Sequence, residues 1–542
     1  MARVYEMTEL CFEGKEPAGS HVEVDVEAEI TGGGKTRKLK GFYAGDQIYK
    51  VRFLPEQEGT YRYKVTGVVT GEGTVDIEPA DGKHHGVVRV DGTHLRHQDG
   101  TFISTFGTTV YALAHQTKEL TEETFTSLEC GAFNKIRMCV FPKHYEYNKN
   151  EPEHFAFYKA ENAGELIFHD NLGGKRRVKP FDTHRPDFDF WEDFETKLNR
   201  LFDMGIQVDL ILFHPYDRWG HSHMTQENNL RYLDYALRRL SAYPNIWWSM
   251  ANEYDLFYDW NIEQWHEIET YISANDPYRH LLSNHNCFLE YDYGREAITH
   301  VSVQTRTCSR VAELQKEFGK PVCYDECCYE GNLKETWGSI SAKEMVNRFW
   351  KVTVTGGYCT HGEVILENDI ATQKQQDDAV LWWAKGGKLK GESPARIKFL
   401  REIVEMLPAP LDPYIEGMSK MMMMSETELS SMINAMPEEH RGFWSVLGRM
   451  NAKEKTYHLL SEYSYAGHIG DEVYLYYLGT DCSARFRPEV AAGKSYQAEI
   501  IDVWDMTREI VAESYKMGDE LRLPGKEYVA VMLRQQPAPM RK

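Results

Sequence analysis

Two short stretches of the chain have the pattern of an apolar strand and end in a glutamate. Residues 247–253 (WWSMANE) end at Glu253, and residues 321–326 (PVCYDE) end at Glu326. Hydrolysis of a glycosidic bond through a covalent sugar intermediate needs two such carboxyl groups, about 5–5.5 Å apart, one as acid/base and one as nucleophile. The spacing in the sequence leaves room for about two strand–helix units between the two strands. The pair therefore indicates a retaining glycosidase whose two acids meet at the mouth of a parallel barrel.

Two alternatives stay open for these acids. Asp325 competes with Glu326 as the nucleophile, because adjacent strand residues face opposite sides and only one can enter a pocket. We favour Glu326. Both Glu253 and Glu326 could instead be buried, ion-paired acids that only stabilise a barrel.

Charge and hydropathy restrict the partners of the protein. The 542-residue chain carries 62 basic and 83 acidic residues, which gives a net charge of −21. Nucleic-acid binding needs clustered Lys and Arg, so we expect no nucleic-acid partner and favour a neutral ligand such as a carbohydrate. The N-terminal segment lacks the apolar core of a secretory signal, and no apolar run reaches the roughly 18 residues of a membrane helix. We therefore expect a cytoplasmic protein with no membrane partner.

The ten cysteines are scattered along the chain, and no two have Cys-x-x-Cys spacing. This distribution predicts neither a disulfide framework nor a structural zinc site. We expect buried free thiols, no metal and no cofactor, and a homo-oligomer is compatible with the sequence.

Three regions differ in the period of their apolar residues. Residues 1–85 alternate with the period of strands, which predicts an N-terminal immunoglobulin-like β-sandwich. Residues 86–408 alternate short strands with helical patterns, which predicts an α/β fold, a (β/α)8 TIM barrel. The strand period returns in residues 409–542 and predicts a second, C-terminal β-sandwich.

Eight segments of the middle region have the pattern of barrel strands. Segments between them, such as residues 190–202, carry apolar residues at helical spacing. An open, doubly wound sheet stays the alternative. The expected strands are residues 102–107, 135–141, 208–213, 246–252, 281–285, 300–304, 322–326 and 358–361.

Polar and aromatic residues gather at the ends of these strands, where a barrel places its reacting groups. A hydroxyl-rich substrate needs hydrogen-bonding side chains, and aromatic faces for the C–H side of a sugar ring. Taken singly, each of these residues could also belong to the core, and Arg137 could belong to an internal ion pair. The candidates for substrate binding are Arg137, His214, Asp217, Trp219, Tyr254, Asn284, His285, Tyr324, Trp337, His361 and Glu363.

The Asn-Glu pair that ends the fourth strand and the glutamate that ends the seventh resemble a large clan of (β/α)8 retaining glycoside hydrolases, which includes cellulases, mannanases and β-galactosidases. The stretches HPYDRWG, ANEYD, YDECCYEG and THGE, with the flanking β modules, resemble more narrowly a group of apiosidase-like bacterial hydrolases. This resemblance implies that Glu253 is the acid/base and Glu326 the nucleophile. It also implies that Asn252 binds the sugar 2-hydroxyl and that Arg137 neighbours the nucleophile. The His-x-Tyr pair that is common in the clan after the sixth strand is not evident around residues 300–303, so the partner that orients Glu326 is not assigned.

Two other classes of function are weighed. His221 and His223 lie beside acids in a predicted strand-end loop, which would suit a metal-dependent barrel hydrolase, although such a pair normally ends the first strand. A non-catalytic carbohydrate-binding protein would suit the two flanking β modules. A binding module, however, has no reason to keep both strand-end acids.

We expect hydrolysis of a terminal, β-linked sugar from oligosaccharides or small glycosides. The insertion from about Pro142 to Pro186 is rich in His, Lys and aromatic residues and is predicted to be the loop that sets specificity.

Overall fold

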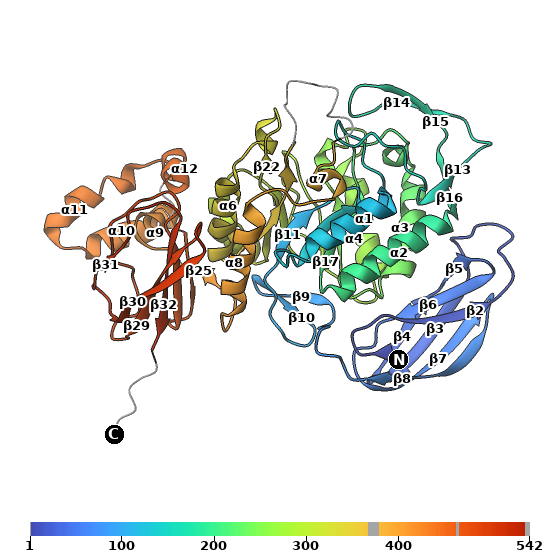
Figure 1. Cartoon of the computed structure of the whole chain (residues 1–542), viewed down its shortest axis with the longest axis horizontal. Coiled ribbons are helices and arrows are strands. Elements are labelled where there is room, and N and C mark those ends of the chain that lie inside the picture. Colours follow the sequence, from blue (N-terminus) through green and yellow to red (C-terminus); the bar gives the residue numbers. More distant parts are fainter. Residues whose placement is uncertain (1, 367–378, 462–464, 537–542) are drawn as a thin grey trace. The chain divides into compact units, whose positions relative to one another are not determined.

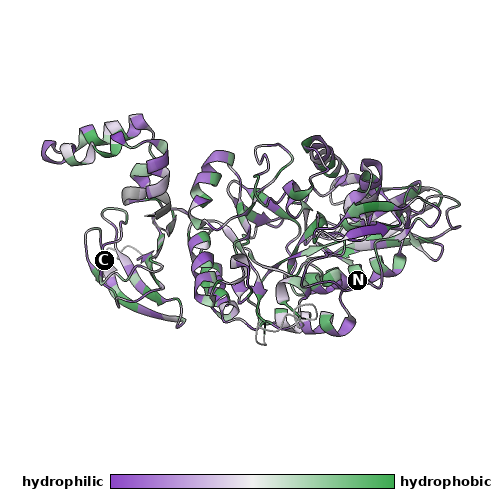
Figure 2. Cartoon of the chain, turned by 90° about the horizontal axis from the view of Figure 1, so that it is seen from above, coloured by the Kyte–Doolittle hydropathy of each residue, from purple (hydrophilic) through white to green (hydrophobic). Residues whose placement is uncertain are grey.

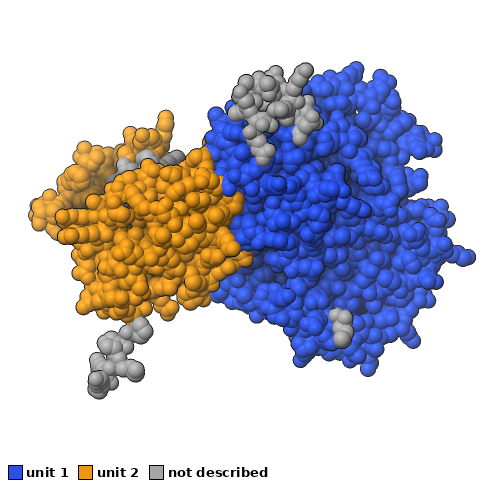
Figure 3. All heavy atoms as spheres, viewed as in Figure 1, with its two compact units in different colours: residues 1–304, 318–340, 360–391 blue, residues 305–317, 341–359, 392–542 orange. Residues whose placement is uncertain are grey.

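The computed structural model describes residues 2–366, 379–461 and 465–536 of the chain. It divides into two compact units (Figure 3), and each is described by itself. Unit 1 comprises residues 1–304, 318–340 and 360–391, and unit 2 comprises residues 305–317, 341–359 and 392–542. This division does not test the boundaries expected at residues 85/86 and 408/409, which stay a prediction.

Unit 1 begins with two sheets that share one apolar core and are antiparallel except where β1 pairs with β8. One has the strand order β1-β8-β7-β3-β4 and the other β2-β6-β5. In β3 the residues Val26, Ala28 and Ile30 face inward while their neighbours are exposed, as the strand period predicts. The strands are β1 (Ala2–Arg3), β2 (Thr8–Glu13), β3 (Val26–Gly32), β4 (Lys35–Lys40), β5 (Phe42–Gly45), β6 (Ile48–Phe53), β7 (Gly59–Gly67) and β8 (Gly71–Glu78), and the hairpin of β9 (Val88–Asp91) and β10 (His94–His97) follows.

Eight strands form the nearly closed parallel barrel (Figure 1), in the order β19-β18-β17-β12-β11-β23-β21-β20. The strands are buried on both faces, as the all-buried β17 shows, and their apolar runs are typical of parallel sheets. Between the two ends of the sheet, Ser283 Oγ donates to the carbonyl of His300 at 2.7 Å. The strands are β11 (Phe106–Thr109), β12 (Lys135–Cys139), β17 (Gln207–Phe213), β18 (Ile246–Ala251), β19 (Leu282–Ser283), β20 (Val301–Gln304), β21 (Val322–Glu326) and β23 (Tyr358–His361).

Each barrel strand overlaps a segment that the sequence predicts as a strand. The first strand begins later than expected, at Phe106 rather than Phe102. Phe102 makes only an isolated bridge to Arg96. The Asn134 side chain accepts from the backbone N–H of Phe106 at 2.7 Å and fixes the start of this strand.

The helices of unit 1 alternate with these strands, and apolar and polar residues alternate along them (Figure 2). Thr117 and Thr225 cap the starts of two helices, and Asn261 with Gln264 forms a capping box at a third. The helices are α1 (Lys118–Leu128), α2 (Phe188–Asp203), α3 (Gln226–Leu240), α4 (Ile262–Asn275) and α7 (Trp382–Lys385). Among the described residues, no helix combines the length and the apolar character needed to cross a bilayer.

The insertion after β12 contains two antiparallel ribbons rather than an irregular loop. The strand β13 (Phe157–Lys159) pairs with β16 (Phe181–Pro186), and β14 (Leu166–His169) pairs with β15 (Lys175–Val178). Outside the insertion, β22 (Glu330–Gly331) pairs in parallel with β24 (Glu363–Val364), and these short strands follow β21 and β23 along the chain. Three of the four strands in the insertion have only three or four residues and give little periodic signal, which explains the prediction of a loop.

Unit 2 contains three helices of the α/β region, α5 (Val311–Phe318), α6 (Ala342–Val354) and α8 (Ser393–Glu405), and the C-terminal sheets. The larger C-terminal sheet has the order β25-β26-β27-β32-β29-β30, and β28 pairs with β31. These strands are β25 (Asp412–Pro413), β26 (Tyr465–Ile469), β27 (Val473–Tyr477), β28 (Arg485–Phe486), β29 (Tyr496–Asp502), β30 (Thr507–Tyr515), β31 (Leu521–Arg522) and β32 (Val529–Gln535).

Four helices interrupt the C-terminal strands, which the prediction of a β-sandwich over residues 409–542 did not include. A capping box of Ser425 and Glu428 starts one of them. They are α9 (Gly417–Met423), α10 (Glu426–Ala435), α11 (Glu438–Trp444) and α12 (Ala452–Ser461).

Candidate active site

Glu253 stands immediately after the buried strand β18, where the backbone turns out of the sheet. Its φ of 57° and ψ of 58° are left-handed, a conformation that costs a residue with a Cβ of order 1 kcal/mol or more. The side chain accepts from Tyr216 Oη, and from Asn252 Nδ2 at 2.9 Å, both on Oε2. Strain of this kind persists where the surrounding structure fixes a side chain for a function.

Glu326 ends β21 and is held from several sides. Tyr111 donates its hydroxyl to Oε1 and Tyr329 donates its hydroxyl to Oε2. His285 Nε2 lies 3.4 Å from Oε1, and Arg137 Nη1 lies 4.0 Å from the same oxygen. These residues provide the orientation for Glu326 that the missing His-x-Tyr pair left unassigned.

The surroundings move the pKa values of the two glutamates in opposite directions. Burial, and then the negative charge of Glu326, raise the pKa of Glu253. Burial alone would also raise the pKa of Glu326, but the hydrogen bond and positive charge of His285, with the charges of Lys143 and Arg137, outweigh it and lower that pKa. The surroundings therefore favour the protonated form of Glu253 and the ionised form of Glu326, which is the division of roles that acid and nucleophile require.

Asp325, the competing acid, points into the barrel interior. Lys135 Nζ donates to its Oδ1 at 2.6 Å, and Ser302 Oγ donates to its Oδ2 at 2.5 Å. Burial is again outweighed, chiefly by Lys135 and Arg137, so the pKa of Asp325 lies far below its usual range. With these partners Asp325 is an internal ion-pair residue, and Glu326 is the carboxylate that lines the cavity.

Both glutamates line one cavity of about 390 Å³ at the carboxyl ends of the barrel strands. Aromatic rings form much of its wall, and the Trp383 ring lies 4.8 Å from that of Tyr145 and 5.5 Å from that of Tyr329, measured between centroids. The lining residues are Tyr111, Lys143, Tyr145, Glu146, Tyr147, Asn171, Leu172, Tyr216, Glu253, Gln304, Glu326, Tyr329, Leu333, Glu335, Trp337, Gly338 and Trp383.

The structure brings part of the predicted binding set to this cavity. Trp337 lines it directly, and Asn252, His285 and Arg137 stand behind the two glutamates. Arg137 is also part of the internal ion pair weighed from the sequence, because its Nε lies 3.0 Å from Asp209 Oδ2.

Eight other predicted residues do not line the cavity. His214 bonds the carbonyl of Phe141, Trp219 Nε1 donates to Glu151, Tyr254 donates to the carbonyl of Glu290, and Asn284 and Tyr324 are buried. Asp217 accepts from the backbone N–H groups of Trp219, Gly220 and Ser222, so it fixes the loop after β17. His361 contacts Thr108, and Glu363 accepts from the backbone N–H groups of Lys390 and Gly391.

Sequence reasoning missed most of the aromatic wall and the lysine. Tyr216 and Tyr329 lie inside the stretches HPYDRWG and YDECCYEG, and Tyr111 follows the first strand, so position at a strand end was the available signal. Trp382 is buried and its Nε1 donates to Thr108 Oγ1, whereas its neighbour Trp383 lines the cavity.

The histidines considered for a metal centre have other partners. His221 Nε2 lies 3.1 Å from the carbonyl of Pro142 and 3.2 Å from Asp217 Oδ1, and His223 Nδ1 lies 4.0 Å from Asp259. Within the described part of the chain, neither histidine belongs to a group of three or more side chains spaced to hold a metal ion. Neither histidine therefore supports the metal-dependent alternative.

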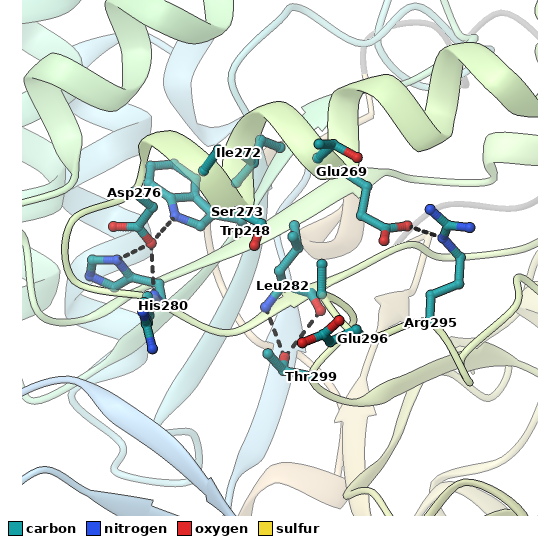
Figure 4. A pocket seen from close by; sticks show the side chains of 14 residues that line it. Trp248, Glu269, Ile272, Ser273, Asp276, His280, Leu282, Arg295, Glu296 and Thr299 are labelled. Atoms are coloured by element: carbon teal, nitrogen blue, oxygen red, sulfur yellow. Dashed lines mark hydrogen bonds and ion pairs between the residues drawn. The ribbon is translucent and has the colours of Figure 1, made fainter.

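A second hollow, of about 730 Å³, lies beside α4 (Figure 4). Two of its acids have partners within the lining: Asp276 accepts from Trp248 Nε1 at 3.0 Å and contacts His280 Nδ1 at 2.8 Å, and Arg295 donates to Glu269 at 2.7 Å. Paired in this way, these acids are structural, and the hollow is not the candidate active site.

Comparisons with known proteins agree with this fold. A parallel barrel with a cavity at the carboxyl ends of its strands is a fold on which many different enzymes place their active sites. A family model described as "Apiosidase-like, catalytic domain" matches residues 90–409, and domains of unknown function match residues 1–67 (DUF5060) and 463–534 (DUF5605). The chain belongs to the apiosidase-like family.

The solved structures give the same class. A protein from Bacteroides vulgatus ATCC 8482, provisionally assigned as a glycoside hydrolase, is 30% identical, with a TM-score of 0.81 over 99% of each chain. A glycoside hydrolase family 5 protein from the same organism shares the fold, at 13% identity and a TM-score of 0.54 over 83% of this chain and 94% of its own. No significant match was found among functionally curated proteins.

Proposed function

We propose that the protein is a retaining glycoside hydrolase in which Glu326 is the nucleophile and Glu253 the acid/base. The observation that carries the proposal is the pair of buried carboxyls in one cavity, whose surroundings raise the pKa of Glu253 and lower that of Glu326.

The first step transfers the sugar to the enzyme. Glu253 gives its proton to the glycosidic oxygen as that C–O bond breaks, and a Glu326 oxygen bonds to the anomeric carbon. Tyr111 and Tyr329 hold the attacking carboxylate in place through their hydroxyls. In the second step Glu253 takes a proton from water, whose oxygen displaces Glu326 from the anomeric carbon. Two inversions retain the configuration.

The insertion after β12 supports action on a terminal, β-linked sugar. Lys143, Tyr145, Tyr147 and Asn171 of this segment line the cavity together with the two glutamates. A wall on this side limits the room for a chain that runs through, so we propose exo action on oligosaccharides or small glycosides. Location in the cytoplasm remains a prediction from the sequence.

A panel of 2-deoxy-2-fluoro β-glycosides with a good leaving group tests the mechanism. The substituent slows the second step, so the expected result is a stable sugar ester on the peptide that carries Glu326, read by mass spectrometry. Proton NMR of the first product should show the same anomer as the substrate. A label on Asp325, or a product of inverted configuration, would overturn the assignment.

A further inference from the structure

Lys143 is a buried cation in the cavity that the catalytic steps above do not use. It follows the end of β12 within the insertion, is only 3% exposed and lines the cavity with both glutamates. Its Nζ lies 3.4 Å from the centroid of the Tyr111 ring and 4.3 Å from that of the Tyr216 ring. Such positions over aromatic faces hold an ammonium group by cation–π attraction.

These two tyrosines connect the lysine to both reacting groups. Tyr111 donates its hydroxyl to Glu326, and Tyr216 donates its hydroxyl to Glu253. No carboxylate oxygen of the described residues lies within the 4.0 Å of an ion pair with Lys143 Nζ. One ammonium group therefore stands against the hydrogen-bond donors of both glutamates and is bound to neither.

The other cations near the glutamates already have anionic partners. Lys135 pairs with Asp325 at 2.6 Å, and Arg137 pairs with Asp209 at 3.0 Å while it approaches Glu326 only to 4.0 Å. Among these lysine and arginine side chains, Lys143 is then the one left to balance the catalytic pair.

The charge of that pair does not change during the proposed reaction. In the free enzyme Glu326 is ionised and Glu253 is protonated, which gives one negative charge. In the sugar ester Glu326 is neutral, and Glu253 has given its proton to the leaving oxygen, which again gives one negative charge. A single positive charge placed between the two carboxyls can therefore balance both states without moving.

We propose that Lys143 is this shared counter-charge, a positioning residue that stabilises whichever of Glu253 and Glu326 is ionised. The inference rests on the proposed function of the two glutamates. In support, the charge of Lys143 lowers the pKa of each glutamate, against the effect of burial. Burial lowers the pKa of Lys143 itself, while both glutamates act to raise it.

The remaining groups around the pair do not take over this role. On the Glu253 side, burial and the glutamate raise the pKa of both Tyr216 and Cys287, so both stay neutral in the working range. On the Glu326 side, the pKa values of Tyr111 and Tyr329 are raised in the same way. His285 lowers the pKa of both glutamates but contacts only Glu326, at 3.4 Å, so it adds to the role of Lys143 rather than replacing it.

The pH dependence of kcat/KM distinguishes a shared charge from a purely structural lysine. Loss of the charge makes both carboxyls harder to ionise, so Lys143→Met should move the acidic limb, set by Glu326, and the alkaline limb, set by Glu253, upward by about one pH unit each. The whole bell moves and keeps its width. Lys143→Arg should return both limbs toward the wild-type positions.

The assay uses the aryl β-glycoside that the wild type hydrolyses, with Lys159→Met as the matched control. Lys159 is a lysine of the same insertion whose Nζ donates to the carbonyl of Trp219, outside the cavity lining, and its loss should leave both limbs in place. Lys143→Gln replaces Lys143→Met if the latter fails to fold. Limbs that stay in place, or movement of only one limb, would overturn the shared role.

Labelling with the fluoroglycoside separates this outcome from failure of the proposed function. A Lys143→Met protein that is still labelled at Glu326 retains the nucleophile and the fold of the cavity. If the wild type itself gives no label and no turnover, the proposed roles of the glutamates fail, whatever the lysine does.

Discussion

Unit 1 contains two buried clusters of charge that differ in how completely they are partnered. In the first, Glu195 of α2 receives Arg52 Nη1 and Nη2 at 2.8 and 2.7 Å and Arg239 Nε at 2.7 Å. Arg52 also donates to Glu9 and to the carbonyl of Arg239, and Arg239 donates to Tyr235. Every charge in this cluster is matched, and it joins the N-terminal sheets to α2 and α3.

The second cluster, around Glu253 and Glu326 in the cavity, has polar groups that lack a partner in the described part of the chain. Among the described residues, Tyr145 Oη, Trp383 Nε1 and Asn252 Oδ1 are buried without a hydrogen-bond partner, and Lys143 has no anion in contact. A buried polar atom without a partner costs about 1–3 kcal/mol, so these atoms in and beside the cavity would gain from a ligand that pairs with them. The comparison separates charge that stabilises the fold from charge that is reserved for a ligand.

The largest expected effect is the loss of the nucleophile. Glu326→Gln keeps the shape of the side chain but cannot form the sugar ester, so turnover should fall by more than about 10⁴-fold. Steady-state hydrolysis of an aryl β-glycoside measures it, with circular dichroism to show that the fold is intact. Activity within about tenfold of the parent would transfer the role of nucleophile to Asp325. It would also contradict the distinction between a cluster that stabilises the fold and a cluster that serves a ligand.

Loss of the acid/base should be smaller and should depend on the substrate. Glu253→Ala should slow glycosides with poor leaving groups by about 10²–10⁴-fold and activated aryl glycosides far less, because a phenolate leaves with little need of a proton. Azide should partly restore activity and form a glycosyl azide of retained configuration. Equal losses on both substrates without such a product would place Glu253 with the structural charges.

In the fully matched cluster, a change should affect stability rather than chemistry. Glu195→Gln leaves two arginines with too little negative charge, and the free energy of unfolding should fall by about 3–5 kcal/mol in urea titrations. Activity of the folded fraction should stay near that of the parent. A variant that unfolds normally but loses activity would contradict the comparison.

Acid unfolding gives a second measurement on the same variant. Although burial acts to raise it, the charges of Arg239 and Arg52 lower the pKa of Glu195 from 4.5 to about 2. A lowered pKa contributes stability that is present above pH 4.5 and is lost as the pH falls toward 2. Glu195→Gln should lack this part of the pH dependence.

The smallest effect is expected from the loss of a single hydrogen-bond donor that has no acceptor among the described residues. Trp383→Phe keeps an aromatic wall but removes an N–H that has no partner among the described residues, so KM should rise roughly three- to tenfold with little change in kcat. Stability should not fall, because no internal bond is lost. Trp382→Phe serves as the matched control, since its N–H bonds Thr108 and its loss should lower stability instead.

Much of the barrel was predictable, because parallel strands buried on both faces read as apolar runs and the eight runs could be found from residue type alone. The two glutamates were predictable because each ends such a run. The aromatic wall and Lys143 were not predictable, since Lys143, Tyr145 and Trp383 come from an insertion and a short helix whose apolar residues show no regular period. The role of Asp217 was also hidden, because an acid that binds a substrate and one that caps a loop look the same in a sequence.

The left-handed backbone at Glu253 sets activity against thermal stability at one position. A glycine adopts this conformation at no steric cost, so Glu253→Gly should relieve the backbone and also remove a desolvated acid that lies beside another. An enzyme selected in the laboratory for its melting temperature alone would be expected to discard this glutamate early. The left-handed backbone disfavours a glutamate here, and its proposed role in turnover explains why the chain keeps one despite the lower stability.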